Sequence, residues 1–354
     1  MLLAQLLKRD NNNLDLVRLI AACLVIYGHA NAIVRPEVYG GDWIASMLVF
    51  DYSGSLAVKV FFFLSGLVVA NSLLEKNNLL YFFIARAFRI IPGFFVVLIG
   101  SAFFLGPAIS TQPFFDYVSN SQTLRYVWGG LLMQVNYDLP GVFKENPISA
   151  VNGSLWSIPY EVGAYWLLAS VFALSVHRCR ALAVALVVFV ILDPLLPQRI
   201  LSNPIPNPEI DSLAPCFAFG ALLALFKHDI KITPKLIFGM LVLFFVFKSK
   251  VYAHYFFYGA LFFGLLYFFS RPILIAMRPR VDISYGVYLW GWPLQQSLVH
   301  FFPEMGVQLH RFVAIGLACG AGWISWSFIE EPFVRWARLC YDRLNSIGWL
   351  NNGR

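Results

Sequence analysis

Three charged or titratable side chains lie in the first apolar segment of the chain, LDLVRLIAACLVIYGHA (residues 14–30). Asp15 and Arg18 have the three-residue spacing at which side chains meet on a helix surface. Between Arg18 and His29 a helix makes three turns plus about 20°. A helix here therefore places all three in one stripe. A charge at the centre of a membrane helix costs about 2.5–3.5 kcal/mol, so we expect the stripe to face a polar cavity.

A histidine in such a cavity suits proton transfer. As a general base it typically contributes 10²–10⁴-fold in rate, and as a nucleophile it carries a group covalently. We take His29 as the leading catalytic candidate and group Asp15 with it. Asp15 and Arg18 are expected to order the floor of the cavity. The structural alternatives are an interfacial ion pair between Asp15 and Arg18 that anchors the helix end, and a core histidine with satisfied hydrogen bonds.

Polar side chains interrupt three further apolar runs. VKVFFFLSGLVVA (58–70) carries Ser65 beside a glycine, where small residues also permit close helix packing. IARAFRIIP (84–92) sets Arg86 and Arg89 one turn apart, a spacing that suits a phosphate clamp, although the cytoplasmic end of a span collects basic residues anyway. In GSLWSIPYE (153–161), Glu161 lies beyond Trp156, whose ring is typical of an interfacial anchor.

Two segments near the C-terminus complete the candidates. ISYGVYLWGWP (283–293) contributes Tyr288, and FIEEPF (328–333) contributes Glu331. We group Ser65, Arg86, Arg89, Trp156, Tyr288 and Glu331 with Arg18 as substrate-binding candidates, and Glu161 with His29 and Asp15 as catalytic ones. The five cysteines are scattered without a CxxC pair, so neither a disulfide framework nor a metal site is indicated.

The elements that position these residues are membrane helices. The 354 residues are 59% hydrophobic and 13% charged, against about 25% charged in soluble domains. A span needs about 20 mostly apolar residues. We therefore predict an all-α, polytopic helical bundle of about ten transmembrane helices, near residues 15–34, 54–74, 90–108, 155–175, 181–197, 211–227, 235–250, 252–270, 284–302 and 309–329.

Loop charges set the predicted orientation. Most Lys and Arg residues, Arg354 included, fall on the side of the N-terminus, and fewer, such as Arg35, fall on the other. The positive-inside rule then places both termini in the cytoplasm and explains the net charge of +7 without nucleic acid. Residues 1–354 are expected to form one transmembrane domain, with a long extracytoplasmic loop at 107–154 as a lid or acceptor platform.

In this order, the segments resemble the acyltransferase-3 family of bacterial membrane acyltransferases, which includes O-antigen and exopolysaccharide O-acetyltransferases. LDLVRLIAACLVIYGHA resembles the first-helix pattern of an arginine followed by a histidine, and VFFFLSGLV the second-helix signature. RAFRIIP is similar to the family's Arg-x-x-Arg element, and GSLWSIPYE to a fourth-helix signature that ends in glutamate. ISYGVYLWGWP and FIEEPF resemble the closing pair. One position departs from the pattern, because Gly291 stands where many members have histidine.

The resemblance implies a donor and an acceptor. The donor would be an acyl-CoA, most often acetyl-CoA, whose phosphates Arg86 and Arg89 would hold. The acceptor would be a hydroxyl of a lipid-linked or surface glycan, reached from the outer side past Glu161. The missing histidine puts more weight on His29. The chain is expected to work in the bacterial cytoplasmic (inner) membrane, without a metal, a nucleic-acid partner or an appended soluble domain.

Two other functions fit parts of the sequence. A transporter or flippase also keeps charges inside a bundle, but no internal repeat is visible and no Walker motif is present. Nothing in the sequence excludes an acyltransferase for a small molecule or a lipo-oligosaccharide signal, because acceptor specificity is expected to depend on the outer loop.

Overall fold

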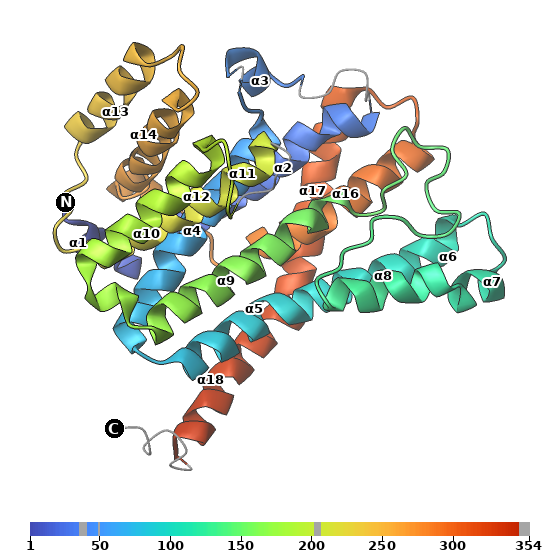
Figure 1. The fold of residues 1–354 in the computed structure, drawn as a ribbon. Coiled ribbons are helices and arrows are strands. Elements are labelled where there is room, and N and C mark those ends of the chain that lie inside the picture. The colour runs from blue at the N-terminus through green and yellow to red at the C-terminus, as the bar shows by residue number, and fades with distance from the viewer. Residues whose placement is uncertain (35–40, 49, 202–206, 347–354) are drawn as a thin grey trace. The chain divides into compact units, whose positions relative to one another are not determined.

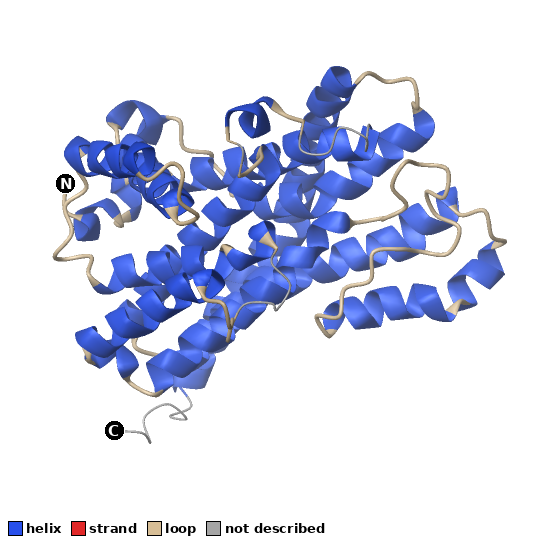
Figure 2. Ribbon diagram, turned by 45° about the horizontal axis from the view of Figure 1, so that its top comes forward, coloured by secondary structure: helices blue, strands red, loops and turns tan. Residues whose placement is uncertain are grey.

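The computed structural model describes residues 1–34, 41–48, 50–201 and 207–346. Within these residues the regular structure is helical, with one isolated backbone bridge between Leu2 and Lys231 and no strand. Figure 2 shows helices throughout. The predicted all-α class is thereby confirmed. Arg35 and Arg354, used in the orientation argument, lie outside the described residues.

The chain divides into two compact units. Unit 1 comprises Met1–Ala21, Trp43–Asn77 and Glu161–Arg280. It contains α1 (Leu3–Leu6), the first part of α2 (Leu14–Val34), α3 (Trp43–Met47), α4 (Ser53–Lys76), most of α9 (Ile158–Ala173), α10 (Arg180–Leu192), α11 (Pro208–Asp211), α12 (Leu213–Leu225), α13 (Pro234–Val246), α14 (Ala253–Phe268) and α15 (Pro272–Ala276), labelled in part in Figure 1.

Unit 2 comprises Ala22–Asp42, Asn78–Tyr160 and Val281–Arg354. It contains the rest of α2, α5 (Leu79–Ile99), a π-helical stretch (Gly100–Leu105), α6 (Gly106–Ile109), α7 (Phe114–Ser119), α8 (Ser121–Leu131), the start of α9, α16 (Ser284–Phe301), α17 (Val307–Ser325), a second π-helical stretch (Trp326–Glu330) and α18 (Glu331–Ser346).

Asparagines fix the start of α2 in unit 1. The side chains of Asn12 and Asn13 accept hydrogen bonds from the backbone N–H groups of Leu14 and Leu16, at 3.2 and 3.1 Å, as N-capping residues do. Asn13 also donates to the carbonyl of Leu274 at 2.5 Å. The run of asparagines before the apolar segment thus both begins α2 and ties it to α15.

Glycines bring α4 and α12 together in unit 1. A Cβ on Gly66 would lie 2.0 Å from the Phe217 carbonyl oxygen, and one on Gly220 would lie 2.3 Å from the Phe63 oxygen. Only glycine permits backbones to approach so closely. The packing function that the sequence allowed for the Ser65-Gly66 pair is therefore met by the glycine.

In unit 2, α5 begins well before the apolar window that predicted a span at 90–108. The Asn78 side chain accepts a hydrogen bond from the Tyr81 N–H at 2.8 Å and starts the helix there. Arg86 and Arg89 therefore lie within the helix, ahead of Pro92. A hydropathy window stops at charged residues, whereas the backbone hydrogen bonds continue through them.

Part of the predicted loop 107–154 is helical. Tyr117 of α7 donates to the Ala102 carbonyl at 2.7 Å, and Gly130 of α8 faces the Leu98 side chain of α5. Tyr117 and Tyr126 are fully buried, and burial raises the pKa of both phenols. Helix α8 therefore packs on the end of α5 and α7 on the π-helical stretch that follows it, and residues 132–152 form the irregular remainder.

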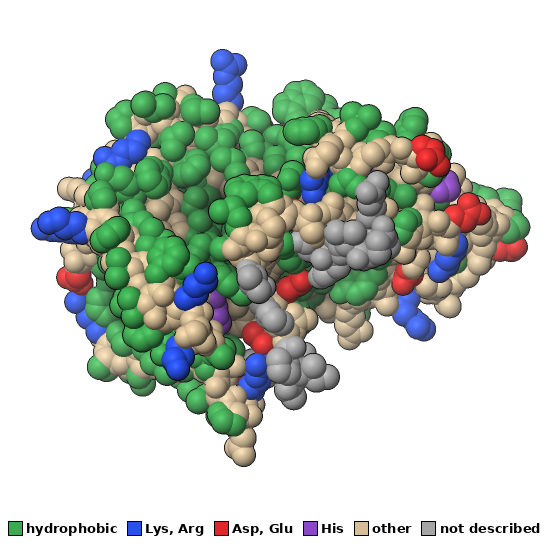
Figure 3. Space-filling model, turned by 90° about the horizontal axis from the view of Figure 1, so that it is seen from above, with side chains coloured by type: hydrophobic (Ala, Val, Ile, Leu, Met, Phe, Trp, Pro, Cys, Tyr) green, Lys and Arg blue, Asp and Glu red, His purple; other side chains and the backbone are tan. Residues whose placement is uncertain are grey.

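Four helices of the described residues are long and apolar enough to cross a membrane, namely Leu14–Val34, Ser53–Lys76, Leu79–Ile109 and Val307–Arg343. Each of the other predicted spans coincides with a shorter helix, so the predicted count of about ten is not confirmed. Large apolar side chains are exposed on many helices, and Figure 3 shows hydrophobic side chains over much of one face. Such a surface is that of a membrane protein.

Candidate functional site

His29 lies in the second half of α2 and contacts the Trp292 ring of α16. The two ring centroids are 4.9 Å apart at an interplanar angle of 67°, an edge-to-face arrangement. The Trp292 indole N–H donates to the Ala150 carbonyl at 2.8 Å. The irregular segment before α9 thus fixes Trp292, and Trp292 in turn fixes one side of the imidazole.

Gly291, the departure from the family pattern, lies where α16 approaches α2. A Cβ at this position would lie 2.7 Å from Cγ1 and 2.9 Å from Cδ1 of Ile26. Real Cβ atoms do not come so close, so a histidine here requires Ile26 to move. The glycine is therefore accounted for by helix packing in this protein.

Three buried polar side chains join α2, α16 and α17, and the first of them, Gln295, lies one turn of α16 after Gly291. Gln295 donates through Nε2 to the Ile26 carbonyl at 2.9 Å, and Arg311 donates through Nε to the Tyr27 carbonyl at 3.3 Å. His310 Nε2 lies 3.1 Å from the Gln295 carbonyl. We call Gln295, His310 and Arg311 the polar trio. None of the three was predicted from the sequence, because their spacing along the chain gives no sign of their contact.

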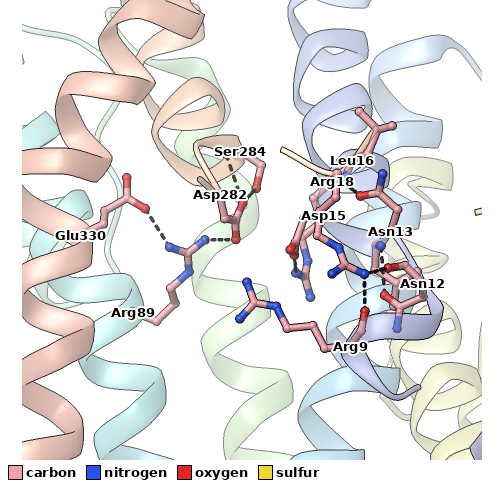
Figure 4. Close-up of polar contacts among 12 residues, drawn as sticks. Arg9, Asn12, Asn13, Asp15, Leu16, Arg18, Arg89, Asp282, Ser284 and Glu330 are labelled. Atoms are coloured by element: carbon pink, nitrogen blue, oxygen red, sulfur yellow. Dashed lines mark hydrogen bonds and ion pairs between the residues drawn. The ribbon is translucent and has the colours of Figure 1, made fainter. Parts of the chain in front are cut away.

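Arg89 is held between two carboxylates in unit 2, as Figure 4 shows. Its Nη2 lies 2.7 Å from Asp282 Oδ2, and its Nη1 lies 2.9 Å from Glu330 Oε2. Ser284 and Ser325 donate to the remaining oxygens of these carboxylates at 2.6 and 2.9 Å. The π-helical stretch before α18 presents Glu330 to this cluster. Both guanidinium nitrogens that would grip a phosphate already have protein partners.

Arg86, one turn earlier on α5, is half-buried. Its side chain has no hydrogen-bond or ion-pair partner among the described residues. Of the two arginines in the Arg-x-x-Arg element, Arg86 is therefore the one whose guanidinium remains available to a ligand.

Ser65 and Glu161, predicted independently, lie together in unit 1. Ser65 Oγ lies 3.3 Å from Glu161 Oε1 and 2.7 Å from the Tyr165 hydroxyl, and Tyr165 donates to the same Glu161 oxygen at 2.5 Å. Tyr165 follows Glu161 by four residues on α9, the helical spacing that could have identified it. The three form a hydrogen-bonded cluster around one carboxylate oxygen.

Asp15 and Arg18 pair with each other at the start of α2. The distance from Arg18 Nη1 to Asp15 Oδ1 is 3.1 Å, and both side chains are about a quarter exposed, at 23% and 25%. Figure 4 shows this pair beside Asn12 and Asn13. Partly exposed pairs contribute about 0–1 kcal/mol. The geometry suits an anchor and a cavity floor equally, and the roles assigned to Asp15 and Arg18 stay predictions.

The other predicted residues occupy different surroundings. The Trp156 ring packs against Tyr160 at 5.9 Å. Tyr288 is buried, and its hydroxyl donates to the Ser154 carbonyl at 2.6 Å. Glu331 pairs with exposed Arg335 at 2.6 Å, whereas its neighbour Glu330 contacts Arg89. Substrate binding by Trp156, Tyr288 and Glu331 stays a prediction.

Unit 1 contains a buried ion pair of its own, in addition to the Arg89 cluster of unit 2. Lys59 Nζ is 2.9 Å from Asp51 Oδ2 and 2.8 Å from Ser55 Oγ, and Tyr258 donates to the same Asp51 oxygen at 2.9 Å. Both charged side chains are 1% exposed. Lys59 is the one charged residue of the VKVFFFLSGLVVA run, and its partner could not be recognised from that run because Asp51 precedes α4.

Two further features carry no site chemistry. The described residues contain no group of three or more His, Cys, Asp or Glu side chains placed to hold a metal. An apolar groove between α4, α9, α10 and α12 has about 510 Å³ of empty space, open side included, and its one titratable lining residue is His177. None of the predicted site residues lines this groove.

The family is decided by comparison with known proteins. The model of the acyltransferase-3 family, described as an acyltransferase domain, matches residues 11–329. This chain belongs to that family. Every candidate residue named from the sequence except Glu331 lies inside the matched range.

Two curated relatives of this acyltransferase-family chain match almost its full length. It is 24% identical over 349 residues to an O-acetyl transferase of Shigella phage Sf6, which covers 92% of this chain and 96% of the relative. It is also 24% identical over 356 residues to Nodulation protein 10 of Rhizobium leguminosarum bv. viciae, at 92% and 93%. No solved structure matches.

Proposed function

We propose that this membrane acyltransferase moves an acyl group, most simply acetyl, from cytoplasmic acyl-CoA to a hydroxyl of a lipid-linked or surface glycan. The bond that breaks is the thioester C–S bond, and the bond that forms joins the acyl carbon to the acceptor oxygen. The single observation that carries the proposal is the family match over residues 11–329, within which one relative is named O-acetyl transferase.

His29 is the proposed proton acceptor. Its imidazole takes the proton of the acceptor hydroxyl as the oxygen attacks the thioester carbonyl, and the proton passes to the departing thiolate. In a second version, His29 first takes the acyl group from CoA and then yields it to the hydroxyl. The edge-to-face contact with Trp292 orients the ring in either version.

The donor side is revised by the geometry of α5. The free guanidinium of Arg86 is the proposed contact for the phosphates of acyl-CoA. Arg89, held by Asp282 just before α16 and by Glu330 of the π-helical stretch, is the proposed positioning residue that keeps α5 in register with these two segments. Arg86→Gln should therefore raise the KM for acyl-CoA, whereas Arg89→Gln should also destabilise the protein.

Within unit 1, Glu161 with Ser65 and Tyr165 is a proposed contact for the acceptor. The cluster concentrates one carboxylate and two hydroxyls, and such groups bind sugar hydroxyls readily. The proposed setting is the bacterial inner membrane with both termini cytoplasmic, within a single domain that includes the 107–154 segment.

The direct test is transfer of radiolabel from acetyl-CoA into a crude lipid-linked glycan fraction, using membranes that contain the wild-type protein. Membranes from cells without the protein are the control. Label in glycan only with the protein supports the proposal. Consumption of acetyl-CoA without label in glycan favours the small-molecule acceptor. If no acyl-CoA is bound or consumed, the acyl-CoA proposal is wrong and transport becomes the better hypothesis.

A further inference from the structure

The polar trio leaves three buried atoms without a hydrogen-bond partner in the described residues: Gln295 Oε1, His310 Nδ1 and Arg311 Nη2. The three residues are at most 3% exposed. They share one neighbourhood, because Gln295 and Arg311 bond adjacent carbonyls of α2, and His310 bonds the Gln295 carbonyl. Buried polar atoms nearly always have hydrogen-bond partners. Three unpaired atoms in one place therefore indicate that a further hydrogen-bonding group binds there.

The hydrogen-bonding pattern defines the chemistry of that partner. Gln295 Oε1 can only accept. His310 Nε2 faces a carbonyl and therefore donates, which leaves Nδ1 of the neutral ring as an acceptor. Arg311 Nη2 can only donate. A simple anion would accept a hydrogen bond from Arg311, but it has no proton to donate to the two acceptors, Gln295 Oε1 and His310 Nδ1. A pair of neighbouring hydroxyls, as on a sugar ring, donates to both acceptors and accepts from Arg311.

The trio lies close to the proposed catalytic histidine. Ile26 and His29 are three residues apart on α2, about 4.5 Å along the helix axis. The Ile26 carbonyl that Gln295 bonds points along the axis toward His29, as helix carbonyls point toward the C-terminus. Gln295 also follows Trp292, the His29 contact, by one turn of α16.

We propose that Gln295, His310 and Arg311 form a hydroxyl-binding subsite for the acyl acceptor. The inference rests on the proposed function and locates one part of its substrate. The Tyr27 ring, 4.0 Å from the Arg311 guanidinium carbon, holds the arginine in place. One hydroxyl bound by the trio orients its neighbour toward His29. The alternative occupant is ordered water, which would satisfy the same atoms without contributing to acceptor recognition.

Two conservative variants test the subsite. Gln295→Met keeps the side-chain size and removes the amide, and Arg311→Lys keeps the charge but replaces the three-nitrogen guanidinium with a single ammonium group. Gln308→Met, an exposed position one turn away on α17, is the matched control. The assay is label transfer from acetyl-CoA to the lipid-linked glycan fraction, with the KM determined for donor and acceptor separately and thermal stability measured for each variant.

The expected result is an acceptor KM raised about five- to tenfold in both variants, the loss expected for one hydrogen bond, with the donor KM unchanged and the control like wild type. An unchanged acceptor KM would assign the site to water and overturn the inference. An equal rise in the donor KM and the acceptor KM, in proportion to a loss of thermal stability, would overturn it as well. If wild type itself labels no glycan, the proposed function fails, and the subsite fails with it.

Discussion

Single residues in this protein are best understood from what surrounds them. Lys59 shows this most clearly, because a buried lysine is tolerable only when a carboxylate and hydrogen bonds compensate for its desolvation. Asp51, Ser55 and Tyr258 provide both. The sequence showed a charge at the edge of an apolar run, but the partner residues are distributed over three segments, and their contact follows only from the packed fold.

Lys59→Met should destabilise unit 1 by about 3–5 kcal/mol, because it leaves Asp51 buried without its cation. The free energy of unfolding can be measured by denaturant titration in detergent micelles. Adding Asp51→Asn to the same chain should restore much of the loss. A stability for Lys59→Met equal to wild type would contradict this account of the pair.

Gly291→Ala should also destabilise, by about 1–3 kcal/mol, since its new Cβ meets Ile26 at 2.7 Å. Gly316→Ala on α17 is the control, because nothing lies within 4 Å of its Cβ. Alanine there should be neutral or slightly stabilising. Thermal unfolding of both variants tests the difference, and equal effects would show that Gly291 is not required by packing.

At the scale of elements, the sequence predicted where helices lie better than where they begin and end. Each predicted span coincides with a helix, because long apolar runs leave few other structures possible in a membrane. The start of α5 was missed because two arginines interrupt the hydropathy, and the helices α7 and α8 were missed because their segment is rich in turn residues. The contact of Glu330 with Arg89 depends on a π-helical stretch that no local pattern predicts.

Two adjacent glutamates, Glu330 at the end of the π-helical stretch and Glu331 at the start of α18, allow a direct comparison. Glu330→Gln removes a buried charge-assisted hydrogen bond to Arg89 and should cost about 1.5–3 kcal/mol. Glu331→Gln removes an exposed pair with Arg335 and should cost less than about 1 kcal/mol. Unfolding measurements on both variants decide the point, and a larger loss for Glu331→Gln would reverse the assignment.

At the scale of the whole molecule, composition sufficed to identify a membrane protein, and ordered motifs sufficed to identify the family. The polar trio and the Ser65–Glu161–Tyr165 cluster could not be predicted in full, because their members come from helices far apart in sequence. The orientation in the membrane remains a prediction from loop charge.

Fusion reporters test that orientation. A fluorescent protein fused to the C-terminus should be fluorescent in cells, because it folds in the cytoplasm, and alkaline phosphatase inserted near residue 120 should be active. The opposite pattern would place the termini outside and would separate Arg86 from cytoplasmic acyl-CoA.

His29 is the residue proposed to carry the chemistry of acyl transfer. The most direct measurement is the rate of label transfer from acetyl-CoA to the glycan fraction by His29→Gln, beside wild type and the exposed-histidine control His228→Gln. His29→Gln should lose at least about 10²-fold in rate at unchanged thermal stability, and the control should keep the wild-type rate. A fully active His29→Gln would contradict the claim and move the search for the catalytic base to another residue of the family domain.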